Sequence, residues 1–410
     1  MFKYKVILLF LVVFFITSSS LVAYSILTHE ALIDAAWEKT IAPALTAKYP
    51  HNSSAEELKK AKAFAYGGAI MPDMGYYPFG KKMFTNLVHY ARSGDFVVEL
   101  IRQSSNINEY AFALGALAHY TADNNGHSLG VNTSVPLLFG YLKRMYGDTI
   151  TYEENHMAHK RAEFSFDIIQ VSRSAYATED YHQFIGFEIS EDLMKKAFAT
   201  TYGFSLTYLV SDFPLAVNTF RWSIQKGFPL IVRAAYKANK KKIKKEDQSL
   251  NKYKQNSNFD ELTYRKNWGN RYKKPGVPSA FATGLVFIIP KVGPFKVLKI
   301  MLPTPETEKK FEDSFTKSYS VYQGYVKELV TTNSLTLANK DFDTGNLSHC
   351  GEYCLADEAY LYLIKKLKKE NYTGMTKELK ENIVLYFSNV SSIKKPQISV
   401  VKELSIITVK

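Results

Sequence analysis

The stretch AHYTADNNGH, residues 118–127, decides the fold, because His119, Asp123 and His127 recur in it every four residues. Side chains four residues apart face the same way on an α-helix, so all three project from one stripe where the helix continues through residue 127. The same stripe holds Ala111, within a run of small and apolar residues, which directs it towards the interior. Two imidazoles and a carboxylate are costly to bury without compensation, and a metal ion supplies it. A hydrogen-bonded histidine–aspartate network in the core is the alternative, but three residues in register favour the metal.

A second pair, His159 and Glu163, has the same four-residue spacing. Taken alone this pair is weak evidence, because histidine and glutamate four residues apart are common on solvated helix faces. His156 is an alternative to His159, but its partner four residues on is Lys160, a poor neighbour for a cation. Three further candidates precede these residues in the chain: His29, Asp73 in a loop flanked by glycine and proline, and His89 on an apolar stretch.

The candidate ligands offer nitrogen and oxygen but no sulfur. Only 2 cysteines occur in 410 residues, which excludes a disulfide scaffold and a thiolate-rich zinc protein. Nitrogen and oxygen ligands suit zinc in a catalytic site, where a position stays open for water. Eight candidates exceed what one zinc ion needs, so the sequence predicts a cluster of two or three ions with a carboxylate bridging two of them.

The composition is that of a globular protein with a large core, since 46% of the residues are hydrophobic and 22% are charged. A formal net charge of +13 is typical of proteins that bind nucleic acids or anionic membranes. The lysines, however, gather partly in residues 237–274, away from the candidate site. The charge is therefore poor evidence for a nucleic-acid partner, and at most it favours approach to an anionic lipid surface.

The first 23 residues have the pattern of a secretory signal peptide. Two lysines within residues 1–5 precede the apolar run 6–17, and the smaller residues 18–23 follow it. The apolar run is too short to span a bilayer as a helix, for which about 20 residues are needed. We expect a secreted or periplasmic protein, with an uncleaved N-terminal anchor as the alternative. Export would permit a disulfide between Cys350 and Cys354, although two unpaired thiols fit the spacing equally well.

Helical patterns dominate the rest of the chain, which predicts a mainly α fold. Residues 24–236 form the expected all-helical domain, with helices near residues 30–47, 55–66, 95–103, 108–124, 153–172 and 190–202 and with clusters such as Gly67-Gly68 separating helices. Residues 237–275 are expected to form a basic polar linker or loop. The role of residues 276–410 is open; an apolar hairpin of helices at 280–302, helices at 304–335 and 356–370, and short β pieces at 398–401 and 404–409 are expected there.

Four phrases of the sequence resemble one known family. They are THEALID at residues 28–34, YGGAIMPDMGYYP at 66–78, HYARSGDF at 89–96 and the helix that contains His119, Asp123 and His127. They resemble the secreted zinc-dependent phospholipase C family, which shares its fold and a trinuclear zinc site with the single-strand-specific S1/P1 nucleases. The same domain opens the glycosylphosphatidylinositol-specific phospholipase D proteins. The resemblance covers about residues 24–235.

The resemblance implies three zinc ions, each with its own ligands. The first ion would be bound by Asp73, His89, His119 and Asp123. The second ion would be bound by His127, His159 and Glu163. The third ion would be bound by Asp123 as the bridge, by His29 and by backbone atoms of the mature N-terminal residue, which is Tyr24 after cleavage behind Ala23.

The implied activity is hydrolysis of a phosphodiester by a zinc-activated water, with Asp73 as general base as well as ligand. We expect a phospholipase C that acts on phospholipids or other phosphodiesters and contacts membranes peripherally, with no specific nucleic-acid partner. One alternative is a single-strand nuclease on the same site. The bases of its substrate could stack on four aromatic rings, which could equally line an acyl-chain pocket: Tyr76, Tyr77, Phe79 and Tyr120. The other alternative is a non-catalytic, zinc-stabilised surface-binding protein.

Overall fold

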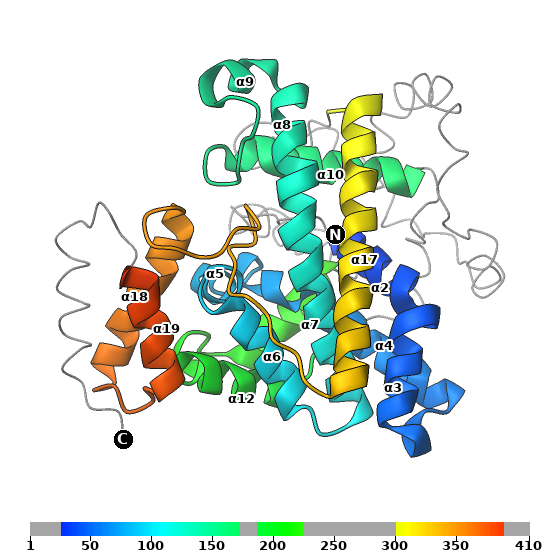
Figure 1. Cartoon of the computed structure of the whole chain (residues 1–410), viewed down its shortest axis with the longest axis vertical. Coiled ribbons are helices and arrows are strands. Elements are labelled where there is room, and N and C mark those ends of the chain that lie inside the picture. The colour runs from blue at the N-terminus through cyan, green and yellow to red at the C-terminus, as the bar shows by residue number, and fades with distance from the viewer. Residues whose placement is uncertain (1–25, 173–186, 225–300, 389–410) are drawn as a thin grey trace, which may run out of the picture.

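A computed structural model describes residues 26–172, 187–224 and 301–388 of the chain (Figure 1). The predicted signal peptide, Tyr24, the basic linker and the β pieces near the C-terminus lie outside these residues, as does almost all of the predicted apolar hairpin at 280–302. Among the helices that are described, none is both long enough and apolar enough to cross a membrane.

The fold is built around helix α7 (Ile107–Asn125). The side chain of Asn106 begins this helix by accepting hydrogen bonds from the backbone N–H groups of Asn108 and Glu109. Almost every residue from Tyr110 to Asn124 is buried, so the helix is covered on all sides. The hydrophobic core surrounds α7, so the side chains of this helix are held in place by the packing around them.

Helix α4 (Ala55–Ile70) packs most closely against α7. A Cβ atom on Gly68 would lie 1.9 Å from the carbonyl oxygen of Phe112, and one on Gly115 would lie 2.1 Å from that of Ala65. The prediction that Gly67-Gly68 separates two helices is therefore wrong. These glycines lie inside α4, where the absence of a side chain lets the two backbones approach.

The described part of the chain forms helices and no β-strand, which confirms the mainly α prediction; an isolated bridge between Lys340 and Leu347 is its β feature. Besides α4 and α7, the elements up to residue 172 are α2 (Ile26–Ala36), η1 (Trp37–Ile41), α3 (Ala42–Lys48), η2 (Pro50–Asn52), η3 (Met71–Tyr76), α5 (Lys82–Tyr90), α6 (Ser93–Gln103), η4 (Gly126–Val131), α8 (Asn132–Leu138), α9 (Gly140–Tyr146) and α10 (His156–Ser172). The later elements are α12 (Glu191–Tyr202), η6 (Leu206–Tyr208), α13 (Phe213–Trp222), α17 (Pro305–Thr332), α18 (Cys354–Lys369) and α19 (Lys377–Ser388).

Helix α17 connects the C-terminal part of the chain to this core. It begins as predicted, with Thr304 capping the N–H of Thr307 and proline at the first helical position. It runs beside the rod formed by α7 and α8 (Figure 1). The Tyr322 hydroxyl donates to the carbonyl of Leu114 at 3.1 Å, and a Cβ on Gly130 would lie 2.6 Å from the Ser314 hydroxyl. Residues on both sides of the expected linker therefore share one core.

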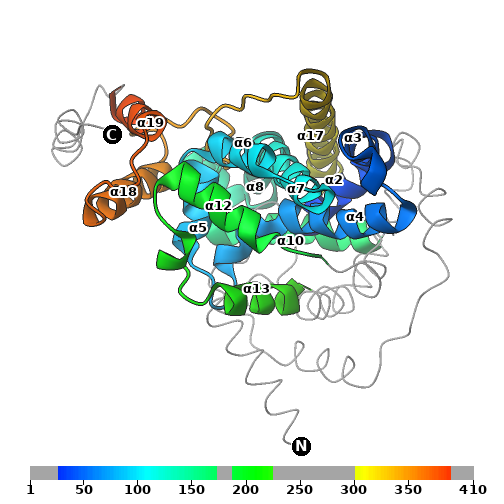
Figure 2. The same cartoon turned by 90° about the horizontal axis from the view of Figure 1, so that it is seen from below.

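The strap, which we define as residues 335–353, leads from α17 to α18 across α6 and α7 (Figures 1 and 2). The Ser93 hydroxyl donates to the carbonyl of Lys340 at 2.6 Å and accepts the N–H of Lys340 at 3.0 Å. The Tyr120 hydroxyl donates to the carbonyl of Ala338 at 2.9 Å. Cys350 at the end of the strap is buried, Cys354 is exposed, and both are free thiols. The strap is thus fastened to α6 and to α7, the helix that presents His119 and Asp123.

Candidate metal centre

The predicted stripe on α7 presents its three polar groups to one interior space. His119 Nε2 lies 3.0 Å from Asp123 Oδ2, and His127 Nε2 lies 3.9 Å from Asp123 Oδ1. The α-helix itself ends at Asn125, and His127 belongs to the π-helical turn η4, whose Gly126 N–H donates to the carbonyls of Ala122 and Asp123. A π-turn in this position is a feature that recurs at functional sites.

Asp123 stands at the centre of the cluster and is fully buried. Its Oδ1 lies 3.2 Å from His29 Nε2, a residue of α2. Its Oδ2 lies 3.4 Å from His89 Nε2, at the end of α5, as well as near His119. Because different histidines face its two oxygens, this carboxylate has the position of a bridge between two ions.

Two groups of candidate ligands lie close enough to hold a metal ion, with the donor atoms of each within 4.8 Å of one another. One consists of His29, His119 and Asp123, and the other of Asp73, His89 and His119. Asp73 comes from the 3₁₀ turn η3, directly after α4. The Thr85 hydroxyl fixes this turn by donating to the carbonyl of Pro72 at 2.6 Å and accepting the N–H of Gly75 at 3.1 Å.

The other predicted ligands meet around Glu163. Its Oε1 lies 2.8 Å from His159 Nδ1, one turn earlier on α10, and 3.5 Å from His127 Nε2. The opposite nitrogen of His159, Nε2, lies 2.8 Å from Asn132 Oδ1. His127 contacts both Asp123 and Glu163, so it connects this group to the other two. His156 is exposed and packs against the ring of Tyr152.

The outer ring nitrogens of three histidines face backbone carbonyl oxygens. His89 Nδ1 lies 2.9 Å from the carbonyl of Thr85, His119 Nδ1 lies 2.8 Å from that of Ala69, and His127 Nδ1 lies 3.0 Å from that of Phe342. A carbonyl oxygen only accepts, so Nδ1 carries the proton in each ring and Nε2 of the neutral imidazole presents its lone pair. This is the state in which histidine binds a metal.

Buried charge dominates the electrostatics of the cluster. Burial lowers the pKa of His89, but the carboxylates of Asp123 and Asp73 outweigh it and raise that pKa to about 9. Burial likewise lowers the pKa of His127, but Asp123 and Asp343 raise it to about 10. The pKa of Asp123 lies well below its usual range, because His119, His127 and His29 outweigh the effect of burial. The carboxylates thus attract positive charge, whether as protons or as metal ions.

These residues fit zinc. The carboxylate oxygens of Asp73, Asp123 and Glu163 are buried and accept no hydrogen bond of good geometry, although each carboxylate faces at least one imidazole. Buried oxygens of this kind call for a cation, and a set of imidazoles and carboxylates without thiolate is typical of catalytic zinc. The structure brings all eight predicted side-chain ligands together; Tyr24 lies outside the described residues.

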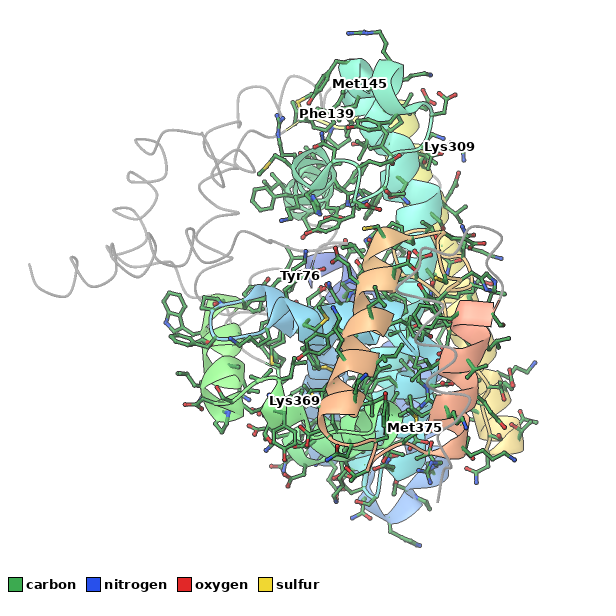
Figure 3. The ribbon with its side chains drawn as sticks, turned by 90° about the vertical axis from the view of Figure 1, so that its left-hand side faces the viewer. Tyr76, Phe139, Met145, Lys309, Lys369 and Met375 are labelled. Atoms are coloured by element: carbon green, nitrogen blue, oxygen red, sulfur yellow. The ribbon has the colours of Figure 1, made fainter. Side chains whose placement is uncertain are left out.

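Three of the four aromatic residues named for base stacking or acyl-chain contact are buried. Tyr76, Tyr77 and Tyr120 are at most 4% exposed, and Tyr76 lies among the side chains of the interior (Figure 3). Phe79, at 58%, is the exposed one of the four. The prediction is therefore wrong for the three tyrosines, because rings that pack within the core cannot stack on a substrate.

Sequence reasoning also missed two residues beside the cluster, Asn132 and Asp343. Asn132 contacts His159, and Asp343 Oδ1 lies 3.4 Å from His127 Nδ1. A signal for Asp343 existed in the phrase DFDTG at residues 341–345, which combines two aspartates with a turn glycine. No regular spacing links that phrase to the histidines, which lie some 200 positions earlier in the chain.

Comparison with known proteins gives one match. Residues 28–205 match the family described as zinc dependent phospholipase C. The chain has no significant match among the curated proteins or among the solved structures. The matched segment contains every side chain from His29 to Glu163 that forms the cluster, whereas Asp343 lies outside it. Residues 28–205 are therefore similar to the zinc-dependent phospholipase C family, which supports a zinc-dependent phospholipase C-like domain in this part of the chain.

Proposed function

We propose that this protein is a secreted phospholipase C that binds three zinc ions and hydrolyses the head-group phosphodiester of phospholipids. The family supports a zinc-dependent hydrolase of the phospholipase C type. The observation that carries the finer proposal is the position of Asp123. Its Oδ1 faces His29 and its Oδ2 faces His89 and His119, next to the group around Glu163. A carboxylate with ligands on both of its oxygens favours several ions held close together, which is the arrangement suited to clamping a phosphoryl group.

Zinc would supply polarisation of the phosphoryl oxygens and a lowered pKa for the attacking water. Asp73 would accept the proton of that water, because its buried carboxylate receives no hydrogen bond of good geometry and lies on the α5-facing side of the cluster, 3.4 Å from His89. Asp123 would keep the imidazoles of His29 and His119 oriented. The exclusion of bulk water around these residues would strengthen each of their electrostatic contacts.

The short distance in sequence between Tyr24 and helix α2 supports Tyr24 as a further ligand in the proposed mature protein. Helix α2 begins at Ile26 and brings His29 into contact with Asp123. Two residues of chain span at most about 7 Å, so an amino group at Tyr24 would stay near the start of this helix. Cleavage behind Ala23 would then create the ligand at the moment of export.

The proposed substrate lies in a membrane, and helix α9 has side chains suited to contact with one. Met145 is 66% exposed and Tyr141 is 53% exposed, and Met145 lies at the outer end of α9, far from Tyr76 (Figure 3). Lys143 and Arg144 stand between them in the sequence. Apolar and basic side chains side by side are typical of residues that enter the interface of an anionic lipid surface.

Purified, zinc-loaded protein tests the proposed activity. We expect hydrolysis of phosphatidylcholine to diacylglycerol and a phosphorylated head group, loss of that activity with a chelator, and its return with zinc. H156Q changes an exposed histidine beside the cluster and should behave as wild type. Hydrolysis of single-stranded DNA without hydrolysis of phospholipid would instead indicate a nuclease. Full zinc occupancy with no turnover of any phosphodiester would contradict both activities.

Metal analysis with N-terminal sequencing of the exported protein tests the proposed centre. We expect three zinc ions per chain and a mature protein that starts at Tyr24. One zinc ion per chain, or a start at another residue, would contradict the trinuclear site with a backbone ligand.

A further inference from the structure

The strap reaches the metal centre although it lies outside the residues that match the family. Phe342 makes two backbone contacts there: its N–H donates to the carbonyl of His89 at 3.2 Å, and its carbonyl faces His127 Nδ1 at 3.0 Å. Its ring lies 4.9 Å from that of His89 and 5.9 Å from that of His119, measured between centroids. One residue of the strap therefore contacts three of the candidate ligands.

Asp343 is buried at the same point. Its Oδ1 lies 3.4 Å from His127 Nδ1. Its Oδ2 accepts hydrogen bonds from the hydroxyls of Tyr90, at 2.9 Å, and Tyr353. Its backbone carbonyl accepts from Asn132 Nδ2 at 2.6 Å, and the other end of that amide, Oδ1, faces His159 Nε2. Asp343 is thus in contact with His127 directly and with His159 through Asn132.

We propose that Asp343 is a positioning residue of the metal centre, which holds His127 and, through Asn132, His159 in the orientation that binds zinc. The proposal rests on the proposed function, in that the cluster must bind zinc. The Phe342 carbonyl lies at hydrogen-bond distance from His127 Nδ1, and the negative charge of Asp343 lies 3.4 Å from the same nitrogen, so both favour a proton on Nδ1 and direct Nε2 towards Glu163. Partners of this kind orient metal-bound histidines, and their loss typically weakens metal binding by about 10- to 100-fold.

The folding of the strap itself depends on a different aspartate. Asp341 accepts the N–H of Thr344 at 2.7 Å and the Thr344 hydroxyl, and its carbonyl accepts the N–H of Gly345, whose φ is +72°. The side chain of Asp343 takes no part in that turn and instead contacts His127, Tyr90 and Tyr353. The two aspartates, two positions apart, therefore separate the turn of the strap from the contact of the strap with His127.

The test compares zinc binding by four full-length variants with that of the wild type. D343N removes the charge at nearly constant size, and Y353F removes one of the two hydroxyls that hold Asp343. D341N weakens the turn of the strap, and E352Q removes an exposed carboxylate from the same segment. Zinc affinity is measured by competition with a chelator, the ligand field by the visible spectrum after cobalt substitution, and folding by circular dichroism.

We expect D343N to fold and to raise the Kd of the zinc ion nearest His127 by about 10- to 100-fold, with an altered cobalt spectrum. Y353F should weaken that ion less, while D341N and E352Q should leave its Kd within about twofold, even where D341N lowers the melting temperature. Unchanged zinc binding and spectrum in both D343N and Y353F would overturn the inference. Equal weakening by D341N and D343N would do so too, because only the fold of the strap would then matter. A wild-type protein that binds no zinc would overturn the proposed function, and with it this inference.

Discussion

Helix α7 with its π-turn and the strap both contact the candidate metal centre, but they reach it in opposite ways. The α7–η4 segment carries His119, Asp123 and His127 at a spacing that any reader of the sequence can recognise. The strap brings Phe342 and Asp343 to the same place from more than 200 positions away. The difference teaches that the candidate ligands of the α7–η4 segment follow from local periodicity, whereas Phe342 and Asp343 reach them through long-range packing.

Loss of the shared carboxylate should have the largest effect. We expect D123N to reduce kcat/KM for phospholipid by at least about a thousandfold, or ~4 kcal/mol of transition-state stabilisation, because asparagine offers one uncharged oxygen where Asp123 offers two charged ones to the histidines on both sides. Steady-state kinetics and metal analysis measure this, with H156Q as the control. Retention of activity and of full zinc content in D123N would show that α7 does not carry the centre.

Disruption of the close packing between α7 and α4 should have the next largest effect. G68A places a methyl group 1.9 Å from the carbonyl oxygen of Phe112, so one helix must shift. We expect a loss of about 3 kcal/mol in the free energy of unfolding, measured by urea denaturation. Gly140, around whose Cβ position no atom lies within 4 Å, gives the matched control G140A, which should be nearly neutral. If G68A were as stable as G140A, the helices would not be in contact as described.

Loss of one hydrogen-bonding contact that holds the strap on α6 should have a smaller effect on stability. S93A removes the hydroxyl that contacts both the N–H and the carbonyl of Lys340, and we expect a loss of about 1–2 kcal/mol in unfolding free energy. Zinc affinity should fall less than in D343N, because Asp343 keeps its contacts. The exposed hydroxyl of Ser388 provides the control S388A, which should stay within about 0.5 kcal/mol of wild type. A larger loss of zinc in S93A than in D343N would reverse the roles given to these two contacts.

The exposed side chains of α9 should have the smallest effect. Combined Y141S and M145S should weaken binding to vesicles that contain anionic lipid by about threefold, which corresponds to ~0.7 kcal/mol. Cosedimentation with the vesicles measures this, and turnover of a water-soluble phosphodiester should be unchanged. Equal vesicle binding by variant and wild type would exclude α9 as a membrane contact.

Sequence analysis predicted the longest helices of the described chain within a few residues at most ends, but it named no range for α5, α8, α9, α13 or α19. The start of α17 at Thr304 and the stripe on α7 depend on neighbouring residues, so local rules suffice for both. The same rules failed at Gly67-Gly68, where a glycine pair that often ends a helix instead permits contact with α7. They failed for Tyr76, Tyr77 and Tyr120 as well, because an aromatic residue near a site can face either the substrate or the core.

The sequence by itself determined a mainly α protein and the candidate ligands on α7 and α10, because helical periodicity depends on the order of neighbouring residues. It identified His29, Asp73 and His89 as candidates without placing them next to Asp123. Only the tertiary structure decided that Asp123 faces histidines on both of its oxygens and that Asp343 lies behind His127. Contacts between residues so far apart in the chain depend on how whole helices and the strap pack, and no spacing in the sequence records that.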